Sequence, residues 1–224
     1  MVVTIDVVRF RRWRDAFRLW RRPDSSFDGR PAFARALVPA HRWTRPDSRA
    51  VAIVATWPDG APAELDLAAL RVAERWRGVF EVQRTRGTLN GADPLRGRPA
   101  APSTGPGAIW TCENAKVRKL PAFFVQNAMV VRELNASPGL TGAFGVLGLW
   151  KRGPWMCTLS FWEDFDAGLA FAYRNAPAHR DAIEMVRAGA FGGTETYFAR
   201  LGLTDSQGTI AGRDPFAGAK PVAA

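Results

Sequence analysis

The chain contains one unit twice, and this repeat constrains the fold more than any other feature of the sequence. The segment Ala55-Thr56-Trp57-Pro58-Asp59 corresponds to Ser160-Phe161-Trp162-Glu163-Asp164. The two tryptophans are 105 positions apart, whereas the glycines that close the units, Gly87 and Gly202, are 115 apart. The second copy is therefore about ten residues longer, and the extra length falls around residues 176–179.

Both copies show the same order of strand-like and helix-like segments. Stretches rich in β-branched residues predict strands, and apolar residues three and four apart predict helices. In the first copy we expect a strand, a helix, two strands, a helix and a strand at residues 2–8, 10–20, 35–44, 50–56, 64–76 and 79–86. In the second copy we expect strands at 109–112, 140–149, 155–162 and 196–201, and helices at 120–134, 166–174 and 177–188.

This order is the ferredoxin-like βαββαβ arrangement. The predicted fold class is α+β, with two tandem ferredoxin-like units whose sheets form a pseudo-twofold dimeric α/β barrel. Residues 1–87 would form the N-terminal unit and residues 108–203 the C-terminal unit with the ligand site. The Pro- and Gly-rich residues 88–107 are predicted to be a linker, and residues 204–224 a flexible tail.

Composition sets limits on the class of protein. Hydrophobic residues make up 47% of the chain, which allows a substantial core, and nine tryptophans and 14 phenylalanines could fill that core or line an apolar pocket. The net charge of +10 comes almost entirely from arginine. It could attract nucleic acid, an anionic membrane or acidic ligands, or reflect a compositional preference for arginine. The Gly–aromatic signature of RNA-binding sheets is absent, so no nucleic-acid partner is expected.

The cysteine count and the hydropathy bear on location. Cys112 and Cys157 form no metal-like cluster with the histidines, and two cysteines do not make a disulfide framework, which favours a reducing cytoplasm. No apolar run approaches the roughly 20 residues of a membrane span. We therefore expect a cytoplasmic protein, at most peripheral to a membrane.

The first predicted helix is both aromatic and basic. Phe10, Trp13, Phe17 and Trp20 are spaced so that they share one helix face, and several arginines lie on the other faces. Two interpretations are open. The aromatic face packs into the core with a solvated basic back, or the helix contacts a membrane surface, which would suit a substrate that resides in lipid.

His179 is the main candidate for chemistry, because it lies in the segment that breaks the repeat. Pro177 suits the first turn of a helix, and Ala182, Ile183 and Val186 share a helix face with His179, which therefore points inward. It could be a hydrogen-bonded core residue. It could also be an axial ligand to haem iron, which needs one neutral imidazole in an apolar pocket. Other histidine metal sites need further ligands, and none stand at suitable spacings.

The surroundings of such a site can be sketched from the sequence. Gly145 belongs to a strand with glycines at three-residue intervals, which either leaves a shallow floor for a ligand or marks bends at a barrel corner. Arg174 and Arg180 would meet haem propionates or remain solvated surface charges. An apolar wall on the substrate side is predicted from Trp110, Phe144 and Phe161. Cys157 is expected to be inert packing.

Several segments of the second half resemble the C-terminal half of spheroidene monooxygenase. The resemblance rests on Phe161-Trp162, on Phe171-Ala172-Tyr173-Arg174, on His179-Arg180-Asp181-Ala182-Ile183, on Val186-Arg187-Ala188-Gly189 and on Phe198-Ala199-Arg200. It implies a haem b cofactor with His179 as the proximal iron ligand, and oxidation of a linear carotenoid to a keto product. Residues 190–195 are smaller and more glycine-rich than in that family, which leaves the substrate open.

The combined expectation is a haem-dependent monooxygenase-type oxidoreductase acting on an apolar small molecule, carotenoid-like or a secondary-metabolite intermediate. It would use a ferredoxin-like electron donor or peroxide. Two alternatives remain open: a haem-dependent dehydratase or N-oxidising enzyme for a nitrogenous substrate, and a cofactor-free α/β-barrel monooxygenase or binding protein. A homo-oligomer is also open, although the internal repeat already supplies the pairing that single-unit proteins gain by dimerising.

Overall fold

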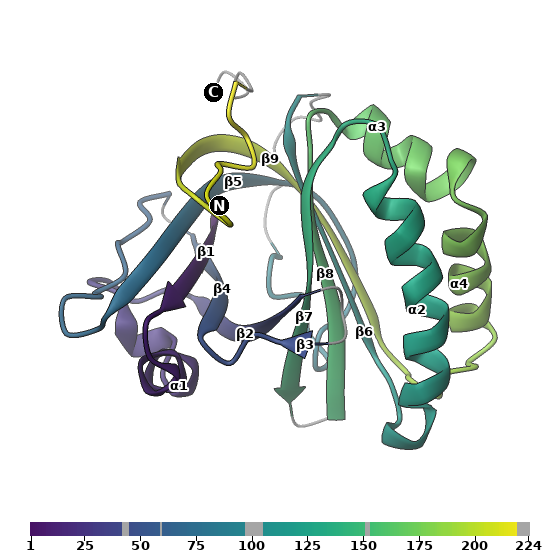
Figure 1. The fold of residues 1–224 in the computed structure, drawn as a ribbon, viewed down its shortest axis with the longest axis horizontal. Coiled ribbons are helices and arrows are strands. Elements are labelled where there is room, and N and C mark those ends of the chain that lie inside the picture. Colours follow the sequence, from purple (N-terminus) through teal and green to yellow (C-terminus); the bar gives the residue numbers. More distant parts are fainter. Residues whose placement is uncertain (42–44, 59, 97–104, 151–152, 219–224) are drawn as a thin grey trace.

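The strands of this protein form one antiparallel sheet that closes on itself (Figure 1). The computed structural model describes residues 1–224 except 42–44, 59, 97–104, 151–152 and 219–224. The strands of the described residues are β1 (Val2–Phe10), β2 (Phe33–His41), β3 (Arg45–Pro46), β4 (Ala50–Trp57), β5 (Val72–Gly87), β6 (Gly107–Asn114), β7 (Leu140–Trp150), β8 (Gly153–Trp162) and β9 (Thr196–Gly208). Their order is β3-β2-β4-β1-β5-β9-β6-β8-β7, and β2 also pairs with β7.

The β2–β7 pairing turns the sheet into a barrel, and alternate side chains fill its interior. The interior is apolar and includes buried residues from every long strand, with Ile5, Trp76, Trp110, Phe161 and Leu201 among them. Since side chains along a strand alternate between the two faces, the residues between these point outward, towards the covering helices and loops.

The helices lie outside the barrel in two groups. α1 (Trp13–Arg21), followed by the 3-10 turn η1 (Asp24–Ser26), packs on β1, β2 and β4. The 3-10 turn η2 (Val117–Lys119), α2 (Leu120–Asn135), α3 (Phe165–Ala170), the π-helical turn η3 (Phe171–Asn175) and α4 (Pro177–Arg187) lie on the side of β6 to β9. This α+β arrangement confirms the predicted fold class, and β6 to β9 with α2 and α4 reproduce the βαββαβ order.

The helix predicted at residues 64–76 is wrong. Residues 72–76 begin β5, and residues 64–71 form a covering loop whose Leu65 bridges Phe27. Backbone hydrogen bonds from Asp28 to Glu64 and from Asp66 to Ser26 hold the loop extended. The leucine spacing mimics a helix because Leu65 is buried against the sheet while Leu67 and Leu70 pack beside it.

Of the two interpretations of the first helix, the one in which its aromatic face packs into the core is wrong for Trp13 and Phe17. Phe10 belongs to β1, and the residues of α1 that are buried are Asp15, Ala16 and Leu19. Trp13 and Phe17 are exposed on the opposite side. Ala16 and Leu19 enter the same apolar cluster as Phe10, which fixes the side of the helix that meets the sheet.

The C-terminal residues are not a free tail as far as the structure describes them. Residues 204–208 belong to β9, and Phe216 is buried among Trp76, Phe80 and Phe161. Asp214 accepts hydrogen bonds from the Trp76 indole and the Ser206 hydroxyl. The expected flexible tail is therefore wrong for residues 204–218, and residues 219–224 lie outside the described part of the chain. Residues 97–104 of the predicted linker also lie outside it.

Candidate functional site

His179 is positioned by an irregular stretch of helix that the sequence dictates. Asp164 precedes α3 and caps it, since its carboxylate accepts from the N–H of Ala167 at 2.7 Å, and α3 continues into the π-helical turn η3. In a π turn the carbonyl of Ala172 would accept from the N–H of residue 177. Residue 177 is proline and has no N–H, so the Ala172 carbonyl is left for a side chain.

That side chain is the imidazole of His179, whose Nδ1 lies 3.2 Å from the Ala172 carbonyl oxygen. A carbonyl only accepts, so Nδ1 carries the hydrogen and Nε2 keeps a lone pair. Burial lowers the pKa of His179 below its ordinary value of 6.5, more than the Ala172 bond and the Glu133 charge raise it. The ring is therefore neutral at pH 7. An Nδ1–H held by a backbone carbonyl is the usual support of a histidine that binds metal through Nε2.

α2 fixes the beginning of α4. The Glu133 carboxylate accepts hydrogen bonds from the N–H groups of Ala178 and His179, at 3.1 and 3.3 Å. The side chain of Gln126 donates to the Ala178 carbonyl at 2.9 Å. Because the first N–H groups of a helix lack partners inside it, a carboxylate there is a strong anchor. The His179 ring also contacts Phe171, with centroids 4.8 Å apart.

The layer between the sheet and the helices α2 and α4 combines apolar and polar side chains. No residue of α4 is fully buried, although His179, Ile183 and Val186 lie along its apolar face. Trp110 and Cys112 point into the barrel, so Thr111 and Glu113 of β6 point out. Gly145, which pairs with Thr158 opposite Thr111, also lies on this outer face. The sheet therefore presents small and polar groups beneath an apolar helix face.

Two polar side chains in this layer lack partners within the described part of the chain. The Asn127 amide nitrogen is buried on the inner side of α2, between the turns that carry Phe123 and Val130, and makes no hydrogen bond. Glu113 forms no ion pair with a cation of the described residues, and burial raises its pKa to about 7 from the ordinary 4.5. Buried polar groups are nearly always hydrogen-bonded, so such groups are candidates for ligand contacts.

The structure brings together only part of the predicted site. Trp110 and Phe161 lie inside the barrel, on the face of the sheet that points away from α4, and Phe144 packs with them. These three do not share a layer with His179. Arg174 and Arg180 are exposed beside it, and Gly145 lies on its side of the sheet. Cys157 faces the interior beside Cys112.

A hollow of about 280 Å³ opens at one end of this layer, where α2 ends and η3 begins. Phe171, which contacts the His179 ring, is part of its wall. No pattern in the sequence indicated this hollow, the anchoring by Glu133 or the unpaired amide of Asn127. The one hint for Glu133 is that it is the single acidic residue of α2 and stands near its C-terminal end, where an acid is unfavourable without a partner.

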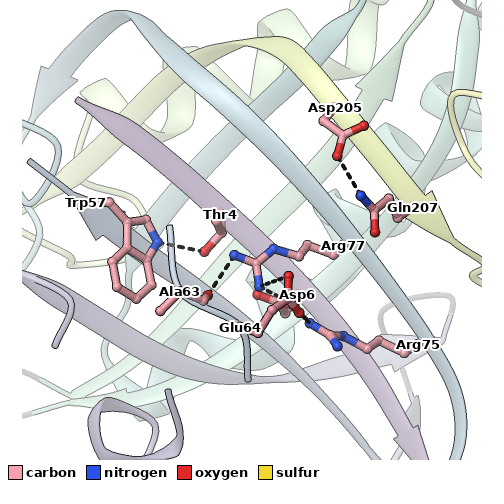
Figure 2. A network of polar contacts seen from close by, with 9 residues as sticks. All are labelled: Thr4, Asp6, Trp57, Ala63, Glu64, Arg75, Arg77, Asp205 and Gln207. Carbon is pink, nitrogen blue, oxygen red and sulfur yellow. Dashed lines mark hydrogen bonds and ion pairs between the residues drawn. The ribbon is translucent and has the colours of Figure 1, made fainter. Parts of the chain in front are cut away.

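The first half carries a closed polar cluster where the second half has this layer (Figure 2). The two halves can be aligned through their equivalent tryptophans, because Val2 pairs with Trp57 and Gly107 pairs with Trp162. Four residues further along each strand, Asp6 then corresponds to Thr111. The fully buried Asp6 carboxylate contacts Arg75 at 3.0 Å and Arg77 at 3.9 Å. Glu64 from the covering loop contacts both arginines. On the neighbouring strand Asp6 faces Arg77, and the corresponding Thr111 faces Phe198. The second half therefore has the apolar ring of Phe198 where the first half has the cation of Arg77.

No family model matches the chain, and no curated protein matches it. Solved structures do. An aldoxime dehydratase crystallised with butyraldoxime is 14% identical, with a TM-score of 0.55 over 91% of this chain and 79% of that one. A second aldoxime dehydratase structure is 14% identical, with a TM-score of 0.52 over 91% and 81%. These two share the fold of this protein.

A heme-degrading enzyme from Listeria monocytogenes shows a weaker likeness to this chain. It is 11% identical, with a TM-score of 0.34 over 89% of this chain and 99% of that one.

The donor groups of the layer fit a haem better than a bare metal ion. Within the described residues, no group of three or more histidine, cysteine or carboxylate side chains could hold an ion. A haem iron needs one neutral imidazole from the protein, and His179 has the protonation, the Nδ1 anchor and the apolar surroundings for that role. Among the helices of the described residues, none is long and apolar enough to cross a membrane.

Proposed function

We propose that this protein is a haem-dependent oxidoreductase of the monooxygenase type that acts on an apolar small molecule. The observation that carries the proposal is the neutral His179 imidazole, tied through Nδ1 to the Ala172 carbonyl, with Nε2 left to bind iron. The cofactor would be haem b, held between α2 and α4 on one side and the outer face of β6 to β9 on the other.

The residues of the layer have separate roles in this proposal. His179 holds the iron, while Ala172 and Glu133 position its ring and its helix. Arg174 and Arg180, exposed beside α4, would meet the propionates. Gly145 and Thr111 leave room on the sheet side, and the unpaired Asn127 amide would donate to a bound ligand. Glu113 would hold a proton near neutral pH. A bound haem would supply the activation of oxygen or peroxide.

The substrate side of the proposal differs from the sequence-based expectation. Trp110, Phe144 and Phe161 are enclosed in the barrel, so the apolar wall would come from α2, α4 and Phe198 instead. An apolar layer with few polar groups favours a hydrophobic substrate, and a carotenoid-like molecule or a secondary-metabolite intermediate fits that description. The electron source would be a ferredoxin-like donor or peroxide.

A second candidate is dehydration of a nitrogenous substrate such as an oxime. It is favoured by the two aldoxime dehydratase structures described above, whose TM-scores are above 0.5 and one of which has butyraldoxime bound. The two functions differ in their need for oxygen. Turnover of the ferrous protein without oxygen would favour dehydration, whereas turnover that depends on oxygen or peroxide would favour oxidation.

Hemin titration of the purified protein tests the proposal. We expect a Soret band that saturates and shifts when carbon monoxide is added to the reduced protein. His179→Ala should lose the carbon monoxide shift or weaken hemin binding at least tenfold, while its far-UV circular dichroism stays unchanged. Arg187→Gln on the same helix is the matched control and should bind hemin normally. Full Soret intensity in a folded His179→Ala protein would refute the ligand assignment.

A further inference from the structure

The exposed side of α1 carries a cluster of aromatic rings. Trp13 is 55% exposed and Phe17 is 46% exposed. Their ring centroids are 6.4 Å apart, and Phe17 stacks on Trp20 at 6.0 Å. Single exposed apolar side chains are ordinary, but several gathered on one helix face mark an interaction surface.

Arginines surround this cluster, and their charge is not neutralised. The six are Arg11, Arg12, Arg14, Arg18, Arg21 and Arg22, all exposed. Within the described part of the chain none of them forms an ion pair. Asp15, the acid of α1, is buried and accepts a hydrogen bond from the Arg71 N–H. Its carboxylate forms no ion pair with these arginines within the described residues.

The arginines and the rings act as one surface. The Arg14 guanidinium lies 5.8 Å from the centroid of Trp13, and that of Arg21 lies 5.8 Å from the centroid of Phe17. Ala16 and Leu19 bury the opposite side of α1 in the core. The helix is thus fixed to the barrel, and its outer face can make contacts without any loss of the fold.

We propose that this face of α1 binds the surface of an anionic lipid bilayer. Tryptophan and phenylalanine rings favour the boundary between headgroups and acyl chains, and arginines bind the lipid phosphates. A nucleic acid would use the charge but gains nothing from an apolar cluster on a helix. In Figure 1, α1 and the α2–α4 pair lie against different parts of the sheet, so membrane contact leaves the His179 layer uncovered.

Vesicle co-sedimentation tests this proposal independently of haem. The full chain should bind vesicles of phosphatidylcholine with 30% phosphatidylglycerol and release them at high salt, while binding pure phosphatidylcholine weakly. The triple variant Arg14→Gln/Arg18→Gln/Arg21→Gln should lower the affinity by about 100-fold, because each arginine near an anionic surface contributes severalfold. Trp13→Ser/Phe17→Ser should also weaken binding and leave a residual attraction that salt abolishes.

Two comparisons decide the outcome. Arg118→Gln/Arg132→Gln removes exposed charge at the other end of the molecule, beside and on α2, and should leave vesicle binding unchanged. All variants should keep the native circular dichroism spectrum. Equal binding to anionic and neutral vesicles, equal loss in the control variant, or binding to RNA without binding to vesicles would overturn the proposal.

Discussion

The backbone N–H of His179 donates to the carboxylate of Glu133, with 3.3 Å between nitrogen and Oε2. The same carboxylate accepts from the neighbouring N–H of Ala178, so one side chain of α2 holds the first turn of α4. The candidate iron ligand is therefore positioned by a residue on another helix, and its geometry depends on the packing of α2 against α4.

Glu133→Ala should lower the free energy of unfolding by about 1–2 kcal/mol, the usual cost of removing a helix N-terminal acceptor. It should also weaken hemin binding more than it weakens the fold, because α4 loses its anchor beside His179. Urea denaturation and hemin titration measure the two effects. Glu184→Ala, an exposed residue of α4, is the control. A Glu133→Ala protein as stable as the wild type would contradict the anchoring role.

Glu113 should make stability depend on pH. Burial raises its pKa to about 7, whereas the unfolded chain releases the proton near 4.5. Between these values the folded state binds the proton that the unfolded state has lost, so stability falls as pH rises and the loss is complete above pH 7. The shift corresponds to roughly 3 kcal/mol.

The variant Glu113→Gln isolates this effect. Its stability relative to the wild type should rise by about 3 kcal/mol between pH 4 and pH 8, as measured by urea denaturation at each pH. The exposed Glu184→Gln should show a flat difference over the same range. A flat difference for Glu113→Gln as well would mean that Glu113 is solvated or paired.

Phe216 should stabilise the barrel as strongly as a strand residue does. It is 4% exposed and lies among Trp76, Phe80 and Phe161. Phe216→Ala should cost about 3–5 kcal/mol in unfolding free energy, and Phe216→Leu should cost less than about 1.5 kcal/mol. Arg213→Ala, an exposed neighbour, should cost little. A negligible loss for Phe216→Ala would show that the segment after β9 does not pack into the core in solution.

The buried charges of the first half should be coupled energetically. Arg77→Met removes one cation beside Asp6 and should cost about 3 kcal/mol. The double variant Asp6→Asn/Arg77→Met should cost at least about 1 kcal/mol less than the sum of the single variants, since removing both leaves no charge without its partner. Arg86→Met, exposed in the same strand, is the control. Additive losses would contradict the coupling.

The sequence predicted the strands and the second-half helices because their residues carry strong periodic signals. Runs rich in β-branched residues such as Val2–Phe10 favour strands over helices, and α4 has both a first-turn proline and an apolar stripe. For residues 64–71 the same reasoning predicted the wrong element. Their leucines face one surface because they cover the sheet as an extended loop, and spacing alone does not distinguish this from a helix.

Which face of an element meets which layer was harder to predict. In α1 the spacing of the aromatic residues left both a buried and an exposed aromatic face open, and the structure buries Ala16 and Leu19 instead. In β6 the alternation of side chains predicts that Trp110 and Thr111 lie on opposite faces of the sheet. It does not tell which face lines the barrel interior and which faces the helices. His179 could be selected from sequence because it lies in the segment that breaks the repeat. Its partner Glu133 could not, because nothing in a single sequence relates residue 133 to residue 179.

The two halves of the barrel carry different residues at corresponding positions, and this difference predicts how many ligands one molecule binds. Two identical units joined by a twofold axis carry any site that lies off the axis in two equivalent copies. Here both units belong to one chain, and Asp6 with Arg77 occupies the positions that Thr111 and Phe198 hold opposite. Because the two halves belong to one chain, their residues at corresponding positions can differ. A saturating titration should therefore end at one ligand per chain.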